Sequence, residues 1–162
     1  MAVRKRRSLS ASITGSRKVN RLSDRAALLY TWMIPQADDE GRLEGNPDDV
    51  KANVVPRKNW SFDEIEELLF EIAAQDLIAW YEVDGERYIQ IHQWEEHQTF
   101  KGMTRIESVI PKVDQGVPVV NPKGFLEKPN RVFLNTEPYP QVKLSEVKRS
   151  EEKGREVKKE PA

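Results

Sequence analysis

The chain has 162 residues, a formal net charge of −1 at pH 7, and a composition of 33% charged and 38% hydrophobic residues. This length fits one domain with tails, and the sequence has no apolar run of the roughly 18 residues that a membrane span requires. It has no cysteine, which excludes disulfides and thiolate metal sites, and its basic start is not followed by the apolar stretch of a secretory signal, so we expect a cytoplasmic protein.

The near-neutral net charge hides a separation of charge along the chain. Residues 1–21 hold seven basic side chains and no acidic one, whereas residues 22–97 hold six basic and eighteen acidic side chains. Residues 1–18 are also rich in serine and lack apolar periodicity, which is typical of chain that does not pack on itself. We therefore predict a flexible basic arm over residues 1–18, followed by a mostly acidic domain.

Two helices and a short strand are predicted in the first half of this domain. Ser23 is a good N-cap for the first helix, and Pro35 ends it. A short alternating strand over residues 42–44 follows, and Asn46 with Pro47 marks the start of the second helix. The inward face of the first helix is its stripe of apolar residues at helical spacing: Ala26, Leu29, Tyr30 and Met33.

The third helix has the strongest local signature in the sequence. Ser61 and Glu64 form a capping box, in which each side chain can bond the backbone N–H of the other residue. After this helix the apolar period changes to two, which predicts strands over residues 77–83 and 87–91. Asp84-Gly85 between these strands predicts a tight hairpin, because glycine easily adopts the positive φ that the turn needs.

This order of elements predicts an α+β fold of the winged helix-turn-helix class over residues 19–97. It comprises three helices, a small antiparallel sheet and a projecting hairpin, the wing. Six of the ten prolines lie between Pro111 and Pro140, and the chain beyond Lys143 is highly charged. Because proline disfavours long helices and central strands, we predict an extended, largely irregular or disordered tail over residues 98–162.

Three stretches of the sequence resemble a family of phage and prophage replication proteins. They are residues 18–35 (KVNRLSDRAALLYTWMIP), residues 38–45 (DDEGRLEG) and residues 88–98 (YIQIHQWEEHQ). Residues 12–105 as a whole are similar to the N-terminal winged-helix region of replisome organisers and DnaD-like primosome proteins. The resemblance implies a role in origin recognition, primosome assembly or helicase loading, with a helicase or its loader as a partner.

Basic residues are the candidate DNA contacts, because affinity for DNA comes chiefly from lysine and arginine. The exposed side of the third helix is acidic, so we expect this helix to stay out of the groove and to present a solvated face; the alternative is that Glu64, Glu67 and Glu71 meet a basic partner or a second copy. For the basic residues, the alternative is an ordinary solvated surface. The candidate DNA contacts lie in the arm, before the third helix, on the wing and after the domain: Arg4, Lys5, Arg6, Arg7, Arg17, Lys18, Arg21, Arg57, Lys58, Arg87, Lys101 and Arg105.

No motif in the sequence indicates catalysis or a cofactor. A phosphate-binding Gly-Lys-Ser/Thr loop and a nucleophile motif are absent, and His92 and His97 are a poor metal-ligand set without cysteine. We therefore predict a non-enzymatic protein that binds double- or single-stranded DNA in replication. The alternative is a winged-helix protein-interaction or oligomerisation module that reaches DNA only through its partners.

Overall fold

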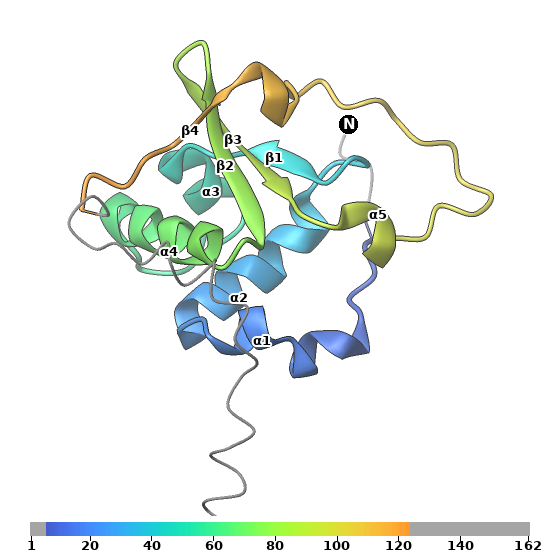
Figure 1. The fold of residues 1–162 in the computed structure, drawn as a ribbon, viewed down its shortest axis with the longest axis horizontal. Helices are drawn as coiled ribbons and strands as arrows, with labels where there is room; N and C mark the ends of the chain where they lie inside the picture. Colours follow the sequence, from blue (N-terminus) through green and yellow to red (C-terminus); the bar gives the residue numbers. More distant parts are fainter. Residues whose placement is uncertain (1–5, 124–162) are drawn as a thin grey trace, which may run out of the picture. The chain divides into compact units, whose positions relative to one another are not determined.

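The computed structural model describes residues 6–123 of the chain. The chain divides into two units, residues 1–121 and 122–162, and only the first is discussed below. Its described part is an α+β fold with five α-helices, three 3-10 turns and one four-stranded antiparallel sheet (Figure 1). No helix within residues 6–123 is long and apolar enough to cross a membrane. The elements in chain order are η1 (Ala11–Gly15), α1 (Arg17–Asn20), α2 (Asp24–Met33), η2 (Ile34–Gln36), β1 (Arg42–Glu44), α3 (Pro47–Asn53), α4 (Phe62–Ala74), β2 (Ile78–Val83), β3 (Glu86–Ile91), α5 (Trp94–His97), η3 (Val113–Gln115) and β4 (Val117–Pro118).

Helix α2 begins at the predicted side-chain cap. The Ser23 hydroxyl accepts a 3.2 Å hydrogen bond from the Ala26 N–H, which satisfies a helix donor that has no backbone partner. The predicted apolar face is confirmed, because its four residues at helical spacing are all buried. The α-helix ends at Met33 and continues as the turn η2, which includes Pro35.

Helix α4 packs against α2 and α3 and carries the predicted capping box. The Glu64 N–H donates to Ser61 Oγ at 3.1 Å, and the Ser61 N–H donates to Glu64 Oε2 at 2.7 Å. The inner face of the helix is fully buried and consists of Ile65, Leu69 and Ile72. Burial of each of these side chains stabilises the fold by about 2 kcal/mol relative to leaving it in water.

The sheet has the strand order β1-β3-β2-β4, and every neighbouring pair is antiparallel. The β2–β3 hairpin is the predicted one, and its turn has Asp84 at φ 51° and Gly85 at φ 83°. Both values lie in the left-handed region that a type I′ hairpin turn requires. Strand β4 is absent from the prediction, because it has only two residues and one of them is Pro118.

Two buried tryptophans tie the sheet and α5 to loops of the domain. The Trp80 indole N–H donates to the Gly45 carbonyl at 2.8 Å, and the Trp94 indole N–H donates to the Asp39 carbonyl at 2.9 Å. An unpaired buried donor would cost about 1–3 kcal/mol, so these two bonds let large rings enter the core without that penalty.

Both segments that flank the predicted domain lie against it, which differs from the expected free arm and tail. Ser8 and Gln98 share two hydrogen bonds at 2.9 and 3.0 Å, and Ile13 packs against the core. After α5 the chain makes a wide loop and returns beside β2 as η3 and β4 (Figure 1). These contacts join residues far apart in sequence, so apolar periodicity does not reveal them. Residues 1–5 and 124–162 of the predicted arm and tail lie outside the described residues.

Candidate nucleic-acid interface and ligand pocket

Arg7, a predicted DNA contact, instead holds the N-terminal segment to the domain. Its Nη2 lies 2.8 Å from Asp39 Oδ1 and donates to the Ala37 carbonyl at 3.1 Å. The guanidinium carbon also lies 5.7 Å from the centre of the Trp94 ring, within cation–π range. Only 10% of the Arg7 side chain is exposed, so little of it is accessible to a phosphate in this structure.

Three more of the predicted DNA contacts form ion pairs with carboxylates of the domain. All three pairs are partly exposed, so each adds little to stability. Each carboxylate nevertheless offsets the positive charge of its partner, which reduces the attraction of that side chain for a phosphate. The hydrogen bonds that Arg105 donates to the Glu95 carboxylate also raise the pKa of the guanidinium. The pairs are Lys18–Asp76 at 3.1 Å, Arg87–Glu66 at 3.4 Å and Arg105–Glu95 at 2.6 Å.

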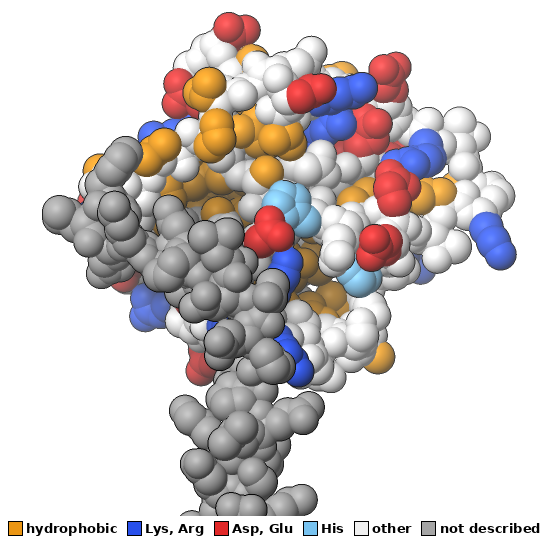
Figure 2. All heavy atoms as spheres, viewed as in Figure 1, with side chains coloured by type: hydrophobic (Ala, Val, Ile, Leu, Met, Phe, Trp, Pro, Cys, Tyr) orange, Lys and Arg blue, Asp and Glu red, His pale blue; other side chains and the backbone are white. Residues whose placement is uncertain are grey.

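The remaining predicted contacts are dispersed over the surface. Arg6, Arg57 and Lys101 are exposed and form no ion pair within residues 6–123. Arg17 and Arg21 are exposed at the two ends of α1 and have interactions within the chain. On the face shown in Figure 2, basic and acidic side chains are mixed and form no continuous basic patch. Arg4 and Lys5 lie outside the described residues.

One cluster around the turn that joins α3 and α4 combines positive charge with aromatic rings that are exposed or half-buried. Lys58 Nζ lies 5.5 Å from the centre of the Trp32 ring. The guanidinium carbon of Arg25 lies 5.6 Å from the centre of the Trp60 ring, and the charge of Arg25 is offset in part by its ion pair with Glu64. Trp32 is 40% exposed, an unusual state for so large an apolar ring. We call this cluster the aromatic–cationic surface, and its six residues are Arg25, Trp32, Arg57, Lys58, Trp60 and Phe62.

The glutamates of the acidic helix α4 interact mainly with other residues of the domain. The Ser61 backbone N–H holds the pKa of Glu64 below its usual value, and Arg25, 3.3 Å away, lowers it further. The Glu71 carboxylate accepts hydrogen bonds from the N–H and the hydroxyl of Ser23, the cap of α2. Glu64 and Glu71, predicted as partner-binding residues, therefore have structural roles. The other two glutamates of the helix also interact within the chain: Glu66 with Arg87, and the exposed Glu67.

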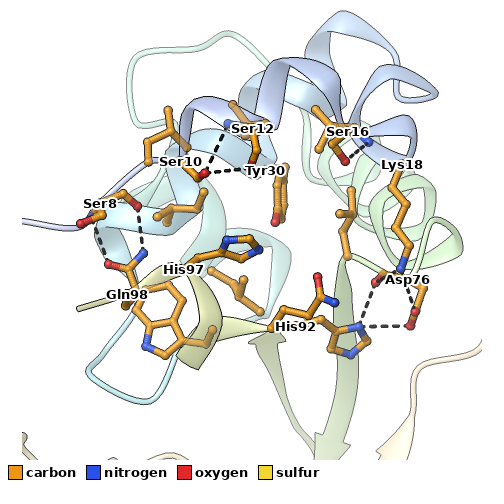
Figure 3. Close-up of a pocket in the computed structure, with 18 of the residues that line it drawn as sticks. Ser8, Ser10, Ser12, Ser16, Lys18, Tyr30, Asp76, His92, His97 and Gln98 are labelled. Atoms are coloured by element: carbon orange, nitrogen blue, oxygen red, sulfur yellow. Dashed lines mark hydrogen bonds and ion pairs between the residues drawn. The ribbon is translucent and has the colours of Figure 1, made fainter. Parts of the chain in front are cut away.

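A pocket of about 280 Å³ lies between the N-terminal segment and the rest of the domain (Figure 3). Residues 8–19 form one wall, and side chains from α2, from the ends of β2 and β3, and from α5 form the others. Two polar contacts join this segment to the opposite wall (Figure 3): the Ser8–Gln98 hydrogen bonds and the Lys18–Asp76 ion pair. No local signal in the sequence indicates this pocket, because its walls come from segments far apart in the chain.

The two histidines line this pocket and do not form a metal site with other ligands. His92 Nδ1 lies 3.1 Å from Asp76 Oδ1, while His97 lies on α5 across the pocket (Figure 3). Within residues 6–123, no group of three or more histidine, aspartate or glutamate side chains could hold a metal ion.

Comparison of the chain with protein-family models, with curated proteins and with solved structures finds no match. A local signal for the aromatic–cationic surface exists in the sequence: Trp32 widens the apolar stripe of its helix beyond the face that can be buried.

Proposed function

We propose that the chain is a non-enzymatic, nucleic-acid-binding module of the winged helix-turn-helix class that serves DNA replication of the phage or prophage type. The α+β arrangement is compatible with this class, with α3, the following turn and α4 as the helix-turn-helix unit and the β2–β3 hairpin as the wing. The observation that carries the proposal is the aromatic–cationic surface at this turn. The assignment to replication, with a helicase or its loader as partner, rests on the resemblance of residues 12–105 to replisome organisers.

Cations and rings have different roles in this proposed interface. Arg57 is exposed, forms no ion pair within the described residues, and lies where helix-turn-helix units commonly contact phosphates. An exposed cation–π contact is worth only about 0.5–1 kcal/mol, so Lys58 can exchange the Trp32 ring for a phosphate at little cost. The exposed faces of Trp32 and Phe62 offer places for bases to stack.

The intramolecular bonds of α4 support this interface. Unpaired carboxylates on a helix repel phosphates. For this reason the sequence predicts that α4 stays out of a DNA groove. Because Glu64 is paired with Arg25 and Glu66 with Arg87, two of these charges are offset near the start and middle of the helix. Phe62 is exposed and is the first residue of α4. The ion pairs make the charge around this end of the helix less negative than the sequence of α4 alone suggests.

The proposed contribution of the N-terminal arm is narrower than the sequence predicts. Arg7 is committed to Asp39, and residues 8–19 form a wall of the pocket. We propose that Arg4, Lys5 and Arg6 add phosphate contacts to those of the aromatic–cationic surface. Deleting the whole arm would remove packed residues such as Ile13, so substitution is the cleaner test.

The test is the fluorescence anisotropy of labelled single- and double-stranded DNA at several salt concentrations. We expect Arg57→Gln to weaken binding and to lower the salt slope by about 1. Lys112→Gln is the matched control, because it removes one exposed positive charge from the η3 side of the domain. If Arg57→Gln and Lys112→Gln weaken binding equally, the aromatic–cationic surface has no specific role in binding DNA. If the full chain does not bind DNA at low salt, the proposed function is refuted.

A second function, protein interaction or self-association, is favoured by exposed apolar side chains in the chain that follows α5. Val109 is 98% exposed, and Ile106 is 65% exposed. Such side chains lose contact with water when a partner covers them, which favours association. Under this alternative, light scattering should show an oligomer that Ile106→Ser with Val109→Ser shifts toward the monomer. A monomer for both proteins at high concentration would rule out self-association.

A further inference from the structure

The pocket behind the N-terminal segment has an apolar interior of a size suited to one small molecule. Ile13 from the segment, Ile34 from η2, Leu77 just before β2 and Ile91 at the end of β3 contribute to its lining, together with Trp94. Cavities of about 150 Å³ with apolar walls accommodate a benzene ring, so about 280 Å³ is sufficient for a single substituted ring. This pocket shares no residue with the aromatic–cationic surface.

Most polar groups of the pocket already have partners within the protein. Ser8 and Gln98 bond each other, and Asp76 bonds both Lys18 and His92 (Figure 3). The charges of Lys18 and Asp76 offset one another at a separation of 3.1 Å. Lys18 and Asp76 are the one basic and the one acidic residue of the lining besides its histidines, so neither sign is in excess to select an ionic ligand.

Among the buried residues of the lining, Tyr30 is the exception, because its hydroxyl has no hydrogen-bond partner within residues 6–123, whereas Gln93 and His97, which also lack side-chain hydrogen bonds there, are exposed. Only 7% of Tyr30 is exposed, and a buried hydroxyl without a partner is costly to the folded protein. Burial raises the pKa of Tyr30, so at neutral pH the group is a hydroxyl that can both donate and accept a hydrogen bond. Across the pocket lies His97, whose side chain forms no ion pair in the described chain (Figure 3).

We propose that this pocket binds a compact, neutral aromatic molecule with one hydrogen-bonding group, which pairs with the hydroxyl of Tyr30. The apolar walls take the ring, and the polar group of the ligand satisfies the hydroxyl that the protein leaves without a partner. A phenol is the simplest molecule of this class.

The test compares p-cresol with toluene, which is the same ring without the hydroxyl. Each is titrated into the full chain while amide shifts are followed by ¹H–¹⁵N NMR. We expect p-cresol to shift the amides of residues 10–19 and 92–98, and to bind about 2- to 12-fold more tightly than toluene, as one hydrogen bond implies.

Tyr30→Phe is the matched variant, because it keeps the ring and removes only the hydroxyl. It should lower the affinity for p-cresol to that for toluene and leave the affinity for toluene unchanged. The proposal is overturned if p-cresol shifts none of these amides up to its solubility limit. It is equally overturned if p-cresol and toluene bind alike, or if Tyr30→Phe weakens both to the same extent.

Discussion

The hydroxyl of Tyr81 in strand β2 donates a 2.6 Å hydrogen bond to the carbonyl of Pro111, thirty residues further along the chain. Tyr81 is almost fully buried and pairs with Pro118 of β4 in the same sheet. Gly116 lies so close that a Cβ there would come within 2.8 Å of the Glu82 carbonyl oxygen. The buried Tyr81 side chain thus helps, together with the pairing of β4, to attach the chain that follows the predicted domain to the sheet.

Removing this hydroxyl should weaken the fold and change its alkaline stability. Burial raises the pKa of Tyr81 from 10.0 to about 12, because the native state favours the neutral phenol. The stabilisation it provides is therefore complete below pH 10 and is lost as the pH rises toward 12. Tyr81→Phe should lower the free energy of unfolding by about 1 kcal/mol at pH 7, measured in urea, and should flatten the decline between pH 10 and 12.

Tyr88→Phe is the control for that experiment. Tyr88 lies opposite Tyr81 in β3 and is half-buried, but its hydroxyl has no hydrogen bond within residues 6–123. Loss of the Tyr88 hydroxyl should leave the midpoint of urea unfolding nearly unchanged. An equal effect of the two substitutions would mean that the Tyr81–Pro111 bond contributes nothing specific.

Glu64 should make the stability of the domain depend on acid pH. The hydrogen bond from the Ser61 N–H is the main reason that its pKa is lowered, and Arg25 adds to the shift. The ionised form is therefore favoured in the folded state, so this contribution is present at neutral pH and is lost as the pH falls below the usual range of a glutamate. Urea unfolding of Glu64→Gln should show less acid dependence than that of the natural sequence.

Ser61→Ala separates the cap from the charge of Glu64. Loss of the serine hydroxyl removes the bond from the Glu64 N–H and should cost about 1 kcal/mol at pH 7. The acid dependence should persist in this variant, because the backbone N–H of residue 61 still reaches the carboxylate. A variant with normal stability at pH 7 would show that the capping box does not contribute to folding.

Gly41 should not tolerate a side chain. Its φ is +79°, and a Cβ there would lie 2.6 Å from Cγ of the buried Trp94 ring. Gly41→Ala combines a strained backbone with overpacking of the core, so we expect a loss of about 2–4 kcal/mol in thermal or urea unfolding. Gly85→Ala is the matched control, because Gly85 has φ +83° with open space around it, and it should cost only about 1–2 kcal/mol. Equal losses would mean that Trp94 can move away.

The exposed rings of the aromatic–cationic surface should favour single-stranded DNA. Bases in a duplex already stack on each other, whereas unpaired bases can stack on Trp32. Trp32→Ala should weaken binding of a single strand about 5- to 100-fold and leave duplex binding nearly unchanged, as measured by anisotropy. Trp32→Phe keeps a stacking face and should retain most of the affinity. Equal weakening of single and double strands by Trp32→Ala would contradict a stacking role.

The sequence by itself determined the elements of secondary structure whose signals are local. Ser61 and Glu64 are three residues apart, and Asp84-Gly85 forms its turn from adjacent residues. The capping box and the hairpin turn each form from residues within four positions of one another, so neither depends on how the elements pack. The same holds for the buried stripe of α2, because helical spacing alone places its residues on one face.

Only the tertiary structure decided which charged and polar groups remain free to act. Arg7 and Asp39 are 32 residues apart in sequence, and Ser23 and Glu71 are 48 apart, yet each pair is bonded. Arg7 and Glu71 each have a sequence context that is typical of a surface residue. That context does not distinguish a contact with a phosphate or a partner from a bond within the chain. The pocket with the unpaired hydroxyl of Tyr30 depends equally on packing, because segments separated by tens of residues must meet to enclose it.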